Sequence, residues 1–263
     1  MPQTLSAPAA LVRRHDPDRF LATLFAPPAV RETLFVLYAF NHEIARAPEV
    51  ASEPALALLR LAWWREVVDG AKRHHEVATP LASLLAAGWL ERDLLFALIE
   101  AREHEVSADF PTLPAWRDHL FATAGNLAVA AGRVLGQGEA APALARFGAA
   151  YGAAGVLRSI PFQAHRGRVL LPADLLARHG LSPAEVAAVP DAPALLPVRR
   201  ALAAEALSWL TEARTIPLPR AALPAALLAV LARRDLRRAT APVRPRGFGA
   251  RLALSRAAFI GRI

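Results

Sequence analysis

Apolar residues recur every three or four positions along most of this chain, whereas alternation with a period of two is almost absent. Residues spaced in this way share one face of an α-helix. In the segment 30–46 the stripe is formed by Leu34, Leu37, Tyr38, Asn41 and Ala45, and in the segment 56–68 by Leu58, Leu61, Ala62 and Arg65. Residues 169–171 are the only run typical of a strand. The sequence therefore predicts an all-α fold.

Predicted helices cover nearly the whole chain. Asp16 is expected to open the first helix, and Ser182 with Glu185 has the spacing of a capping box at the start of another. Further helices are predicted over residues 80–87, 91–104, 115–135, 140–164, 183–188, 198–211 and 223–238. No linker is long enough to separate domains, so we predict a single domain over residues 1–263.

The composition is that of a globular protein. Hydrophobic residues make up 54% of the 263 residues, and the absence of cysteine excludes disulfides, iron–sulfur clusters and thiolate zinc sites. The longest apolar run, residues 221–232, is interrupted by Pro224 and is shorter than the roughly 20 residues that a membrane-spanning helix needs. Residues 1–12 lack the features of a signal peptide. We therefore expect a cytoplasmic protein of bacterial type.

The net charge is +8, and all the cationic side chains except Lys72 are arginines. Arginine suits bidentate contacts to phosphate, but the abundance of alanine and proline also indicates GC-rich coding. The basic residues concentrate in a C-terminal segment at about 233–263, where Phe248, Leu252, Leu254 and Phe259 are interleaved. Such a segment is typical of contact with an anionic membrane surface. A solvated basic tail and, less favoured, an RNA-binding tail are the alternatives.

Three local patterns resemble the squalene/phytoene synthase family. The first covers residues 37–43 and continues to Arg46 and Glu49, the second covers residues 61–66, and the third covers residues 157–172. Their order and separation are similar to those of the family over almost the whole chain. The resemblance implies an isoprenoid synthase-type helical bundle around a central cavity.

The family's chemistry, as the resemblance implies it, joins two prenyl diphosphates head to head with a cluster of Mg²⁺ ions held between two aspartate-rich helices. The metal-binding carboxylates are expected at the positions of Ala45, Arg46, Glu49, Ser159 and Gln163. Glu49 alone keeps a carboxylate there, and Arg46 adds a positive charge. We therefore predict no catalytic residue, no metal site and no cofactor.

Without these carboxylates, we expect only a vestigial substrate pocket at this site. Pro161 should bend the helix predicted over residues 140–164. Glu43 should pair with a nearby arginine, because it lies on a different side of the helix at 30–46 from Ala45. The residues assigned to the pocket are Tyr38, Asn41, Ala45, Glu49, Arg158, Ser159, Gln163 and Arg166.

A second candidate site is a set of carboxylates and histidines around residues 103–105. Glu103, His104 and Glu105 could combine with Asp109 and His119. An ordinary polar helix end is the favoured interpretation of the same residues.

Residues 39–43, 157–162, 171–174 and 179–182 resemble a narrower, non-catalytic branch of the family, which includes a mitochondrial respiratory complex I assembly factor. The resemblance implies a helper of respiratory complex I (NADH dehydrogenase) assembly that binds a partner, a lipid or both, with complex I subunits or assembly proteins as the protein partners. An apolar cavity retained in the bundle could accept a prenyl lipid. Peripheral contact with the inner membrane through the C-terminus is part of this hypothesis, and nucleic acid is not an expected partner. The alternatives are a Mg²⁺-dependent prenyl transferase using farnesyl or geranylgeranyl diphosphate, and a membrane adaptor acting through its basic C-terminus alone.

Overall fold

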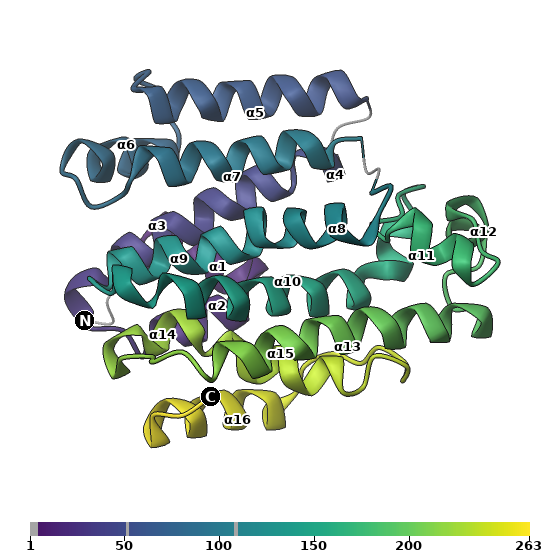
Figure 1. Ribbon diagram of the computed structural model, residues 1–263. Coiled ribbons are helices and arrows are strands. Elements are labelled where there is room, and N and C mark those ends of the chain that lie inside the picture. The colour runs from purple at the N-terminus through teal and green to yellow at the C-terminus, as the bar shows by residue number, and fades with distance from the viewer. Residues whose placement is uncertain (1–4, 51–52, 108–109) are drawn as a thin grey trace.

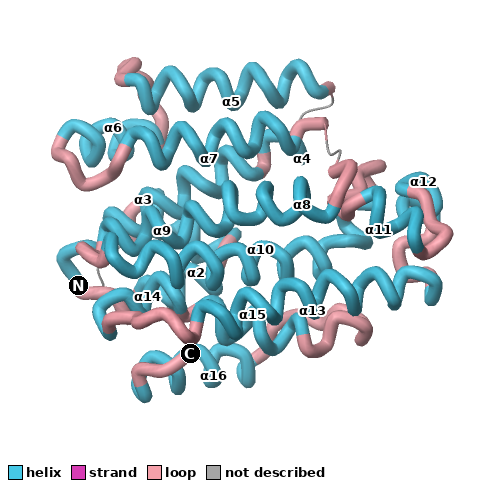
Figure 2. Tube along the Cα trace, in the orientation of Figure 1, coloured by secondary structure: helices cyan, strands magenta, loops and turns pink. Residues whose placement is uncertain are grey.

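The computed structural model describes residues 5–50, 53–107 and 110–263, and within these ranges it contains helices and loops but no strand (Figure 2). The first helices are α1 (Ala7–His15), α2 (Pro17–Thr23), α3 (Pro28–Ala45), α4 (Ala47–Val50), α5 (Pro54–Asp69), α6 (Ala78–Ala86), α7 (Arg92–Glu105) and α8 (Leu113–Leu120). Then follow the π-helical turn η1 (Phe121–Gly125), α9 (Asn126–Val134), α10 (Ala141–Ala164), α11 (Ala173–Arg178), α12 (Pro183–Ala188), α13 (Leu196–Ala213), α14 (Leu223–Ala226), α15 (Leu228–Leu236) and α16 (Phe248–Ile260). The all-α prediction is confirmed.

The N-terminal region contains one helix more than the sequence suggested. Ser6 caps α1 by accepting a hydrogen bond from the Ala9 backbone amide at 3.2 Å. Asp16 caps α2 in the same way, accepting from the Arg19 amide at 3.1 Å. Asp16 therefore opens the second helix, and the expectation that it opens the first is wrong.

Helix α5 buries a different face from the one predicted. Leu58 is 44% exposed, whereas Leu61 and Trp64 are buried and pack with Val68 into the core. The stripe through Leu58 and Ala62 was therefore wrong. Both stripes have helical spacing, and only the packing against α7 decides between them.

Several predicted boundaries change in the second half of the chain. The single helix expected over 115–135 is divided by η1, and the helix expected over 223–238 is interrupted at Leu227. Residues 169–171 form no strand. Helix α10 agrees with the range predicted over 140–164 and continues through Pro161 to Ala164. The capping box of Ser182 and Glu185 is confirmed.

The helices form successive layers with α10 near the middle (Figure 1). Helices α8 and α9 lie on one side of α10, and α13 and α15 lie on the other. Helices α5 and α7 form the outer layer beyond α9, and α16 covers α15 at the opposite edge. The main core takes side chains from both sides of α10, and buried residues of α10 itself contribute to it along most of the helix.

The C-terminal helix α16 is held by a smaller apolar cluster. Ala250, Leu254 and Ala257 turn inward against α15 and α2. The predicted C-terminal segment therefore begins inside α15, which belongs to the bundle. None of the helices in the described ranges combines the length and the hydropathy needed to cross a bilayer.

Candidate functional site

Helix α3 carries the first motif into the core. Pro28 opens the helix, and residues 33–41 are all buried. Tyr38 is buried with the guanidinium of Arg19 over its ring, 5.6 Å from the centroid. Asn41 is also buried, and its Oδ1 atom has no hydrogen-bond partner among the described residues. Both side chains therefore lie inside the bundle, as a residual pocket requires.

A hydrogen bond between two side chains joins the first motif to the third. Gln163, on α10, donates a hydrogen bond from Nε2 to Oε1 of Glu49, on α4, across 3.1 Å. The structure thus places the predicted facing walls next to each other. Their contact joins an amide to a carboxylate, and its geometry is that of an ordinary hydrogen bond.

The charges near Glu49 do not form an acidic cluster. Glu43 is buried and pairs with Arg46, with 3.5 Å between Oε1 and Nη1. This confirms Glu43 as an ion-pair partner. Ala45 contributes no polar side chain. The wall formed by α3 and α4 is therefore close to neutral.

These residues do not fit the Mg²⁺ cluster that the family resemblance implies. Magnesium requires several oxygen ligands, usually with at least one or two carboxylates. In the described ranges no three histidine, aspartate or glutamate side chains gather in a way that could hold a metal ion. Glu49 has only the amide of Gln163 opposite it. The donor set is one carboxylate and one amide.

The other residues predicted for the pocket, on α10 and just after it, contact different neighbours. The hydroxyl of Ser159 donates to the carbonyl of Val156 in its own helix, at 3.1 Å. The Arg166 guanidinium stacks on Phe162, 3.8 Å from the ring centroid. Arg158 points to Asp235 on α15, with 3.5 Å between Nη1 and Oδ1. The structure therefore brings Glu49 and Gln163 together but does not gather the predicted set into one site.

A network of ion pairs and phenols that the sequence did not reveal occupies the interior beside α2. The hydroxyl of Tyr151 donates to Asp18 Oδ2 at 3.2 Å. Arg246 from the C-terminal segment pairs with Asp18 and with Asp235, the latter at 2.5 Å. Arg19 lies over the Tyr151 ring, 5.1 Å from its centroid. The network joins α2, α10, α15 and the segment before α16.

Charges in this network are fixed at neutral pH. Burial raises the pKa of Tyr38 to about 12 and also raises the pKa of Tyr151. Burial opposes the charge of Arg19, but Asp16 and Tyr151 outweigh it and raise the Arg19 pKa. The phenols therefore keep their protons, and Arg19 stays cationic.

Little space is left at the centre of the bundle. The cavity bounded by Arg19, Tyr38 and Tyr151 has a volume of about 10 Å³. This is room for about one water molecule. Gly148 and Gly152 let α10 approach η1 so closely that a Cβ atom on either would collide with Ala124. These close approaches keep the space between α10 and η1 small.

The second candidate site is a buried ion-pair cluster. Glu105 is buried and pairs with Arg102, with Arg168 at 3.5 Å and with His119 at 3.3 Å. Glu103 instead pairs with Arg65, and Asp109 lies outside the described residues. The arginines compensate the carboxylate, so the cluster stabilises the end of α7 against the segment after α10.

Nothing in the sequence marked Asp18 or Arg246 as partners. Asp16 was considered only as a helix start, and Arg246 only as part of the basic C-terminal segment. An acid three residues before an arginine at a helix start is a local signal that could have revealed the pair of Asp16 and Arg19, which are 2.5 Å apart.

Comparison with known proteins gives matches along almost the whole chain. Residues 12–257 match the family described as squalene/phytoene synthase. A dehydrosqualene synthase solved in complex with ligand superposes with a TM-score of 0.79 at 14% identity, covering 96% of this chain and 94% of that one. The squalene synthase HpnC from Alicyclobacillus acidocaldarius gives a TM-score of 0.68 at 19% identity, covering 97% and 92%. At these identities the solved structures show the shared fold alone.

Curated relatives carry a different description. The NADH dehydrogenase (ubiquinone) complex I, assembly factor 6, of Bos taurus is 28% identical over 179 residues, covering 65% of this chain and 54% of that protein. The Homo sapiens protein is 27% identical over the same shares. The Drosophila melanogaster homologue is 28% identical over 185 residues, covering 66% and 55%. The chain thus spans about half the length of the curated relatives that it matches.

Proposed function

The chain belongs to the squalene/phytoene synthase family, and we propose that it acts without catalysis, as an assembly factor for respiratory complex I (NADH dehydrogenase). The observation that carries the proposal is the contact between Glu49 and Gln163. At the place where the family resemblance expects facing carboxylates, one carboxylate accepts a hydrogen bond from an amide. The assembly role is supported by relatives whose names state it.

Two features of the interior support the non-catalytic part. Departure of a diphosphate needs cations to stabilise the developing charge. Arg46, which pairs with Glu43, places a positive charge where a divalent cation would be needed. The space of about 10 Å³ beside Tyr38 and Tyr151 also leaves no room for a prenyl chain. We therefore propose that the protein works without Mg²⁺ or another cofactor.

Gene deletion with complementation tests the assembly role. We expect the deletion strain to lose assembled complex I on native gels and NADH oxidation in its membranes. Glu49→Gln should restore both, because the new amide can still accept the hydrogen bond of Gln163. The substitution removes the one carboxylate left at the positions where the family resemblance expects metal ligands. Normal complex I in the deletion strain would refute the role in assembly.

A functioning prenyl transferase is the alternative, and the likeness in fold to two synthases favours it. Purified protein would be incubated with farnesyl or geranylgeranyl diphosphate and Mg²⁺, and diphosphate release would be measured. We expect no turnover above that of a heat-inactivated sample. Sustained release that Glu49→Gln abolishes would establish the enzyme.

A peripheral position at the inner membrane is the finer part of the proposal. Helix α16 exposes Phe248 and Phe259, at 79% and 76%, together with Leu252 and Ile260. The exposed Arg251 and Arg256 lie on the same helix. Apolar side chains next to cations are typical of helices that lie on anionic bilayers. A prenyl lipid would then bind at this surface, because the space of about 10 Å³ beside Tyr38 and Tyr151 is too small for it.

Vesicle sedimentation tests the membrane contact. We expect the protein to pellet with phosphatidylglycerol vesicles and to stay in solution with phosphatidylcholine vesicles. Phe248→Ser combined with Phe259→Ser should abolish pelleting. Leu56→Ser with Leu59→Ser is the matched control, since these leucines are also exposed, at 49% and 66%, but belong to α5 at the opposite edge. Equal loss in both double variants would contradict a specific role of α16.

A further inference from the structure

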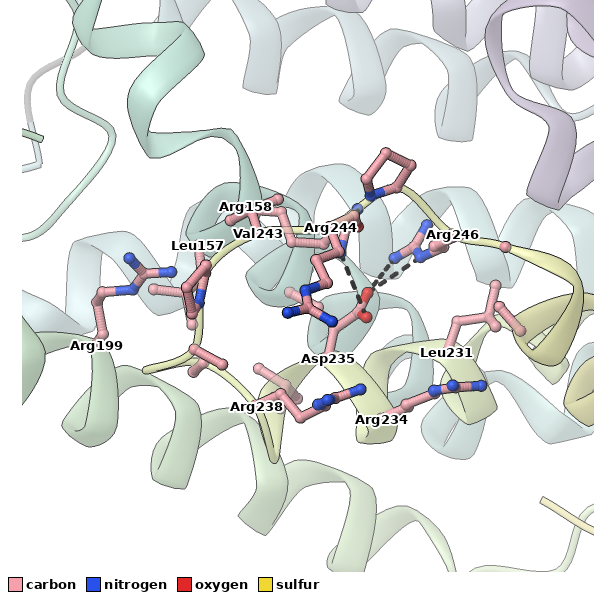
Figure 3. A pocket seen from close by; sticks show the side chains of 18 residues that line it. Leu157, Arg158, Arg199, Leu231, Arg234, Asp235, Arg238, Val243, Arg244 and Arg246 are labelled. Carbon is pink, nitrogen blue, oxygen red and sulfur yellow. Dashed lines mark hydrogen bonds and ion pairs between the residues drawn. The ribbon is translucent and has the colours of Figure 1, made fainter. Parts of the chain in front are cut away.

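A pocket rich in arginine lies between α10, α13, α15 and the segment before α16 (Figure 3). Its volume is about 160 Å³. Six arginines line it, namely Arg158, Arg199, Arg234, Arg238, Arg244 and Arg246. Asp235 is the one acidic side chain among the described residues of its lining. The pocket therefore has a surplus of positive charge.

Asp235 does not neutralise this surplus. Figure 3 shows it between Arg158 and Arg246, which approach it to 3.5 and 2.5 Å. Arg246 is also paired with Asp18, so its charge is compensated as well. The described part of the chain offers no acidic partner within ion-pair distance to the other four arginines, which are Arg199, Arg234, Arg238 and Arg244.

Arg199 is the least expected of these side chains. It is only 6% exposed, and its Nε atom has no hydrogen-bond partner among the described residues. Burial lowers the pKa of its guanidinium and Asp191 partly opposes this from beyond ion-pair distance, but arginine remains protonated in proteins. A buried charge without a partner destabilises a protein. An anion bound in the pocket would supply what the chain does not.

The arginine pocket lies apart from the contact between Glu49 and Gln163. Arg158 and Gln163 are both on α10 but five residues apart, so they point to nearly opposite sides of the helix. Gln163 faces Glu49, and Arg158 faces α15. A ligand in the arginine pocket would therefore not occupy the vestigial metal site.

We propose that this pocket binds a phosphate group, either free or as the headgroup of a phospholipid. Guanidinium groups bind phosphate oxygens in bidentate pairs, which lysine cannot reproduce. The volume of about 160 Å³ is many times the roughly 10–15 Å³ that one water molecule needs, so a phosphate group fits in it. Leucine, valine and proline side chains complete the lining and strengthen these electrostatic contacts by excluding water.

The geometry fits a lipid source, because Phe248, the exposed start of α16, follows directly after the lining residues Arg246 and Gly247. This inference goes beyond the assembly role and does not depend on it. The pocket binds phosphate whether or not the protein assists complex I, so the two ideas are tested separately.

Titration of the full-length protein with inorganic phosphate, followed by calorimetry and thermal unfolding, tests the pocket. We expect saturable binding and a rise in melting temperature that chloride at equal ionic strength does not produce. Arg199→Gln and Arg234→Gln should each weaken binding about tenfold or more, as the loss of a charge-assisted hydrogen bond predicts. Arg200→Gln is the matched control, because Arg200 is the exposed neighbour on α13 and does not line the pocket.

A structural role of Arg199 predicts the opposite behaviour. If the guanidinium only stabilised the fold, Arg199→Gln would lower the melting temperature without phosphate and leave the phosphate-induced shift unchanged. We expect the variant to be as stable as wild type without phosphate and to lose the shift.

Vesicles identify the source of the phosphate. Pelleting with phosphatidic acid, lost in Arg199→Gln and kept in Arg200→Gln, would support a headgroup site even without binding of free phosphate. Saturable binding of inorganic phosphate alone would support a free anion. Absence of an Arg199-dependent effect with both probes would overturn the proposal.

Discussion

The Nε2 atom of Gln163 lies 3.1 Å from Oε1 of Glu49 and donates a hydrogen bond to it. The two residues are 114 positions apart in the sequence, and their contact fixes α4 against the end of α10. Gln163 is only 6% exposed. In place of a pair of acids that repel each other unless a cation separates them, the chain has a pair that is satisfied without one.

Gln163→Glu should therefore destabilise the protein by roughly 2 kcal/mol at pH 7, because a second buried carboxylate would face Glu49 without a donor. Burial and Glu49 raise the folded-state pKa of the introduced carboxyl above its unfolded value. The destabilisation is then present above that pKa and relieved as the pH falls below it. Urea denaturation at pH 7 and pH 5 measures both effects. Gln163→Met, which loses the hydrogen bond without gaining a charge, should show no such relief.

Glu105 should make the protein sensitive to acid. Burial opposes its charge, but Arg102, His119 and Arg168 outweigh burial and lower its pKa from 4.5 to about 2. A lowered folded-state pKa contributes stability above the unfolded pKa of about 4.5, and this contribution is lost as the pH falls toward 2. The shift corresponds to about 3 kcal/mol.

Glu105→Gln tests this contribution. The variant should be less stable than wild type at pH 7 by about 3 kcal/mol, and the difference should shrink between pH 4.5 and pH 2. Chemical denaturation across this range gives the free energy of unfolding at each pH. The exposed Glu100 on the same helix provides the control, and Glu100→Gln should leave the curve unchanged. A constant difference between Glu105→Gln and wild type at every pH would contradict the assignment.

The helices could be read from the sequence because their signals are local. Helix α12 begins and ends where its capping box and apolar pattern placed it, at Pro183 and Ala188. Helix α1 was missed although its signals are also local, since Ser6 caps it and Pro8, Ala9 and Val12 form its buried face. The buried face of α5 was assigned wrongly because two stripes share Leu61, and the choice between them depends on α7, which lies elsewhere in the sequence.

Part of the candidate site could likewise be predicted from the sequence, and part could not. The loss of carboxylates at Ala45, Ser159 and Gln163 can be read directly from the sequence, because the motifs fix these positions. The pairing of Asp18 with Arg246 spans 228 positions, and no local pattern specifies it. The small volume at the centre of the bundle likewise depends on how closely the helices approach, which periodicity does not report.

Arg246 should hold the C-terminal segment to the bundle. Its guanidinium pairs with Asp18 of α2 and with Asp235 of α15. Arg246→Gln leaves both acids without that charge in a half-buried place, and the loss of a buried partner costs about 3 kcal/mol. Hydrogen exchange measured by mass spectrometry should show faster exchange in α16 than in wild type. Arg251→Gln, at an exposed position of α16, should exchange like wild type, and equal acceleration in both variants would contradict the role of Arg246.

Two glycines of α10 should respond in opposite directions to the same substitution. A Cβ atom at Gly148 would collide with the backbone oxygen of Ala124 and lie 2.8 Å from the Cβ of Ala128, whereas at Gly155 nothing lies within 4 Å. Gly155→Ala should therefore stabilise the helix by about 0.5–1 kcal/mol, the usual gain of alanine over glycine. Gly148→Ala gains the same propensity but forces α10 away from η1 and α9, and such overpacking costs about 1–3 kcal/mol. Urea denaturation of both variants measures the difference. If Gly148→Ala were as stable as Gly155→Ala, α10 and η1 could separate without cost, and the centre of the bundle would be able to open.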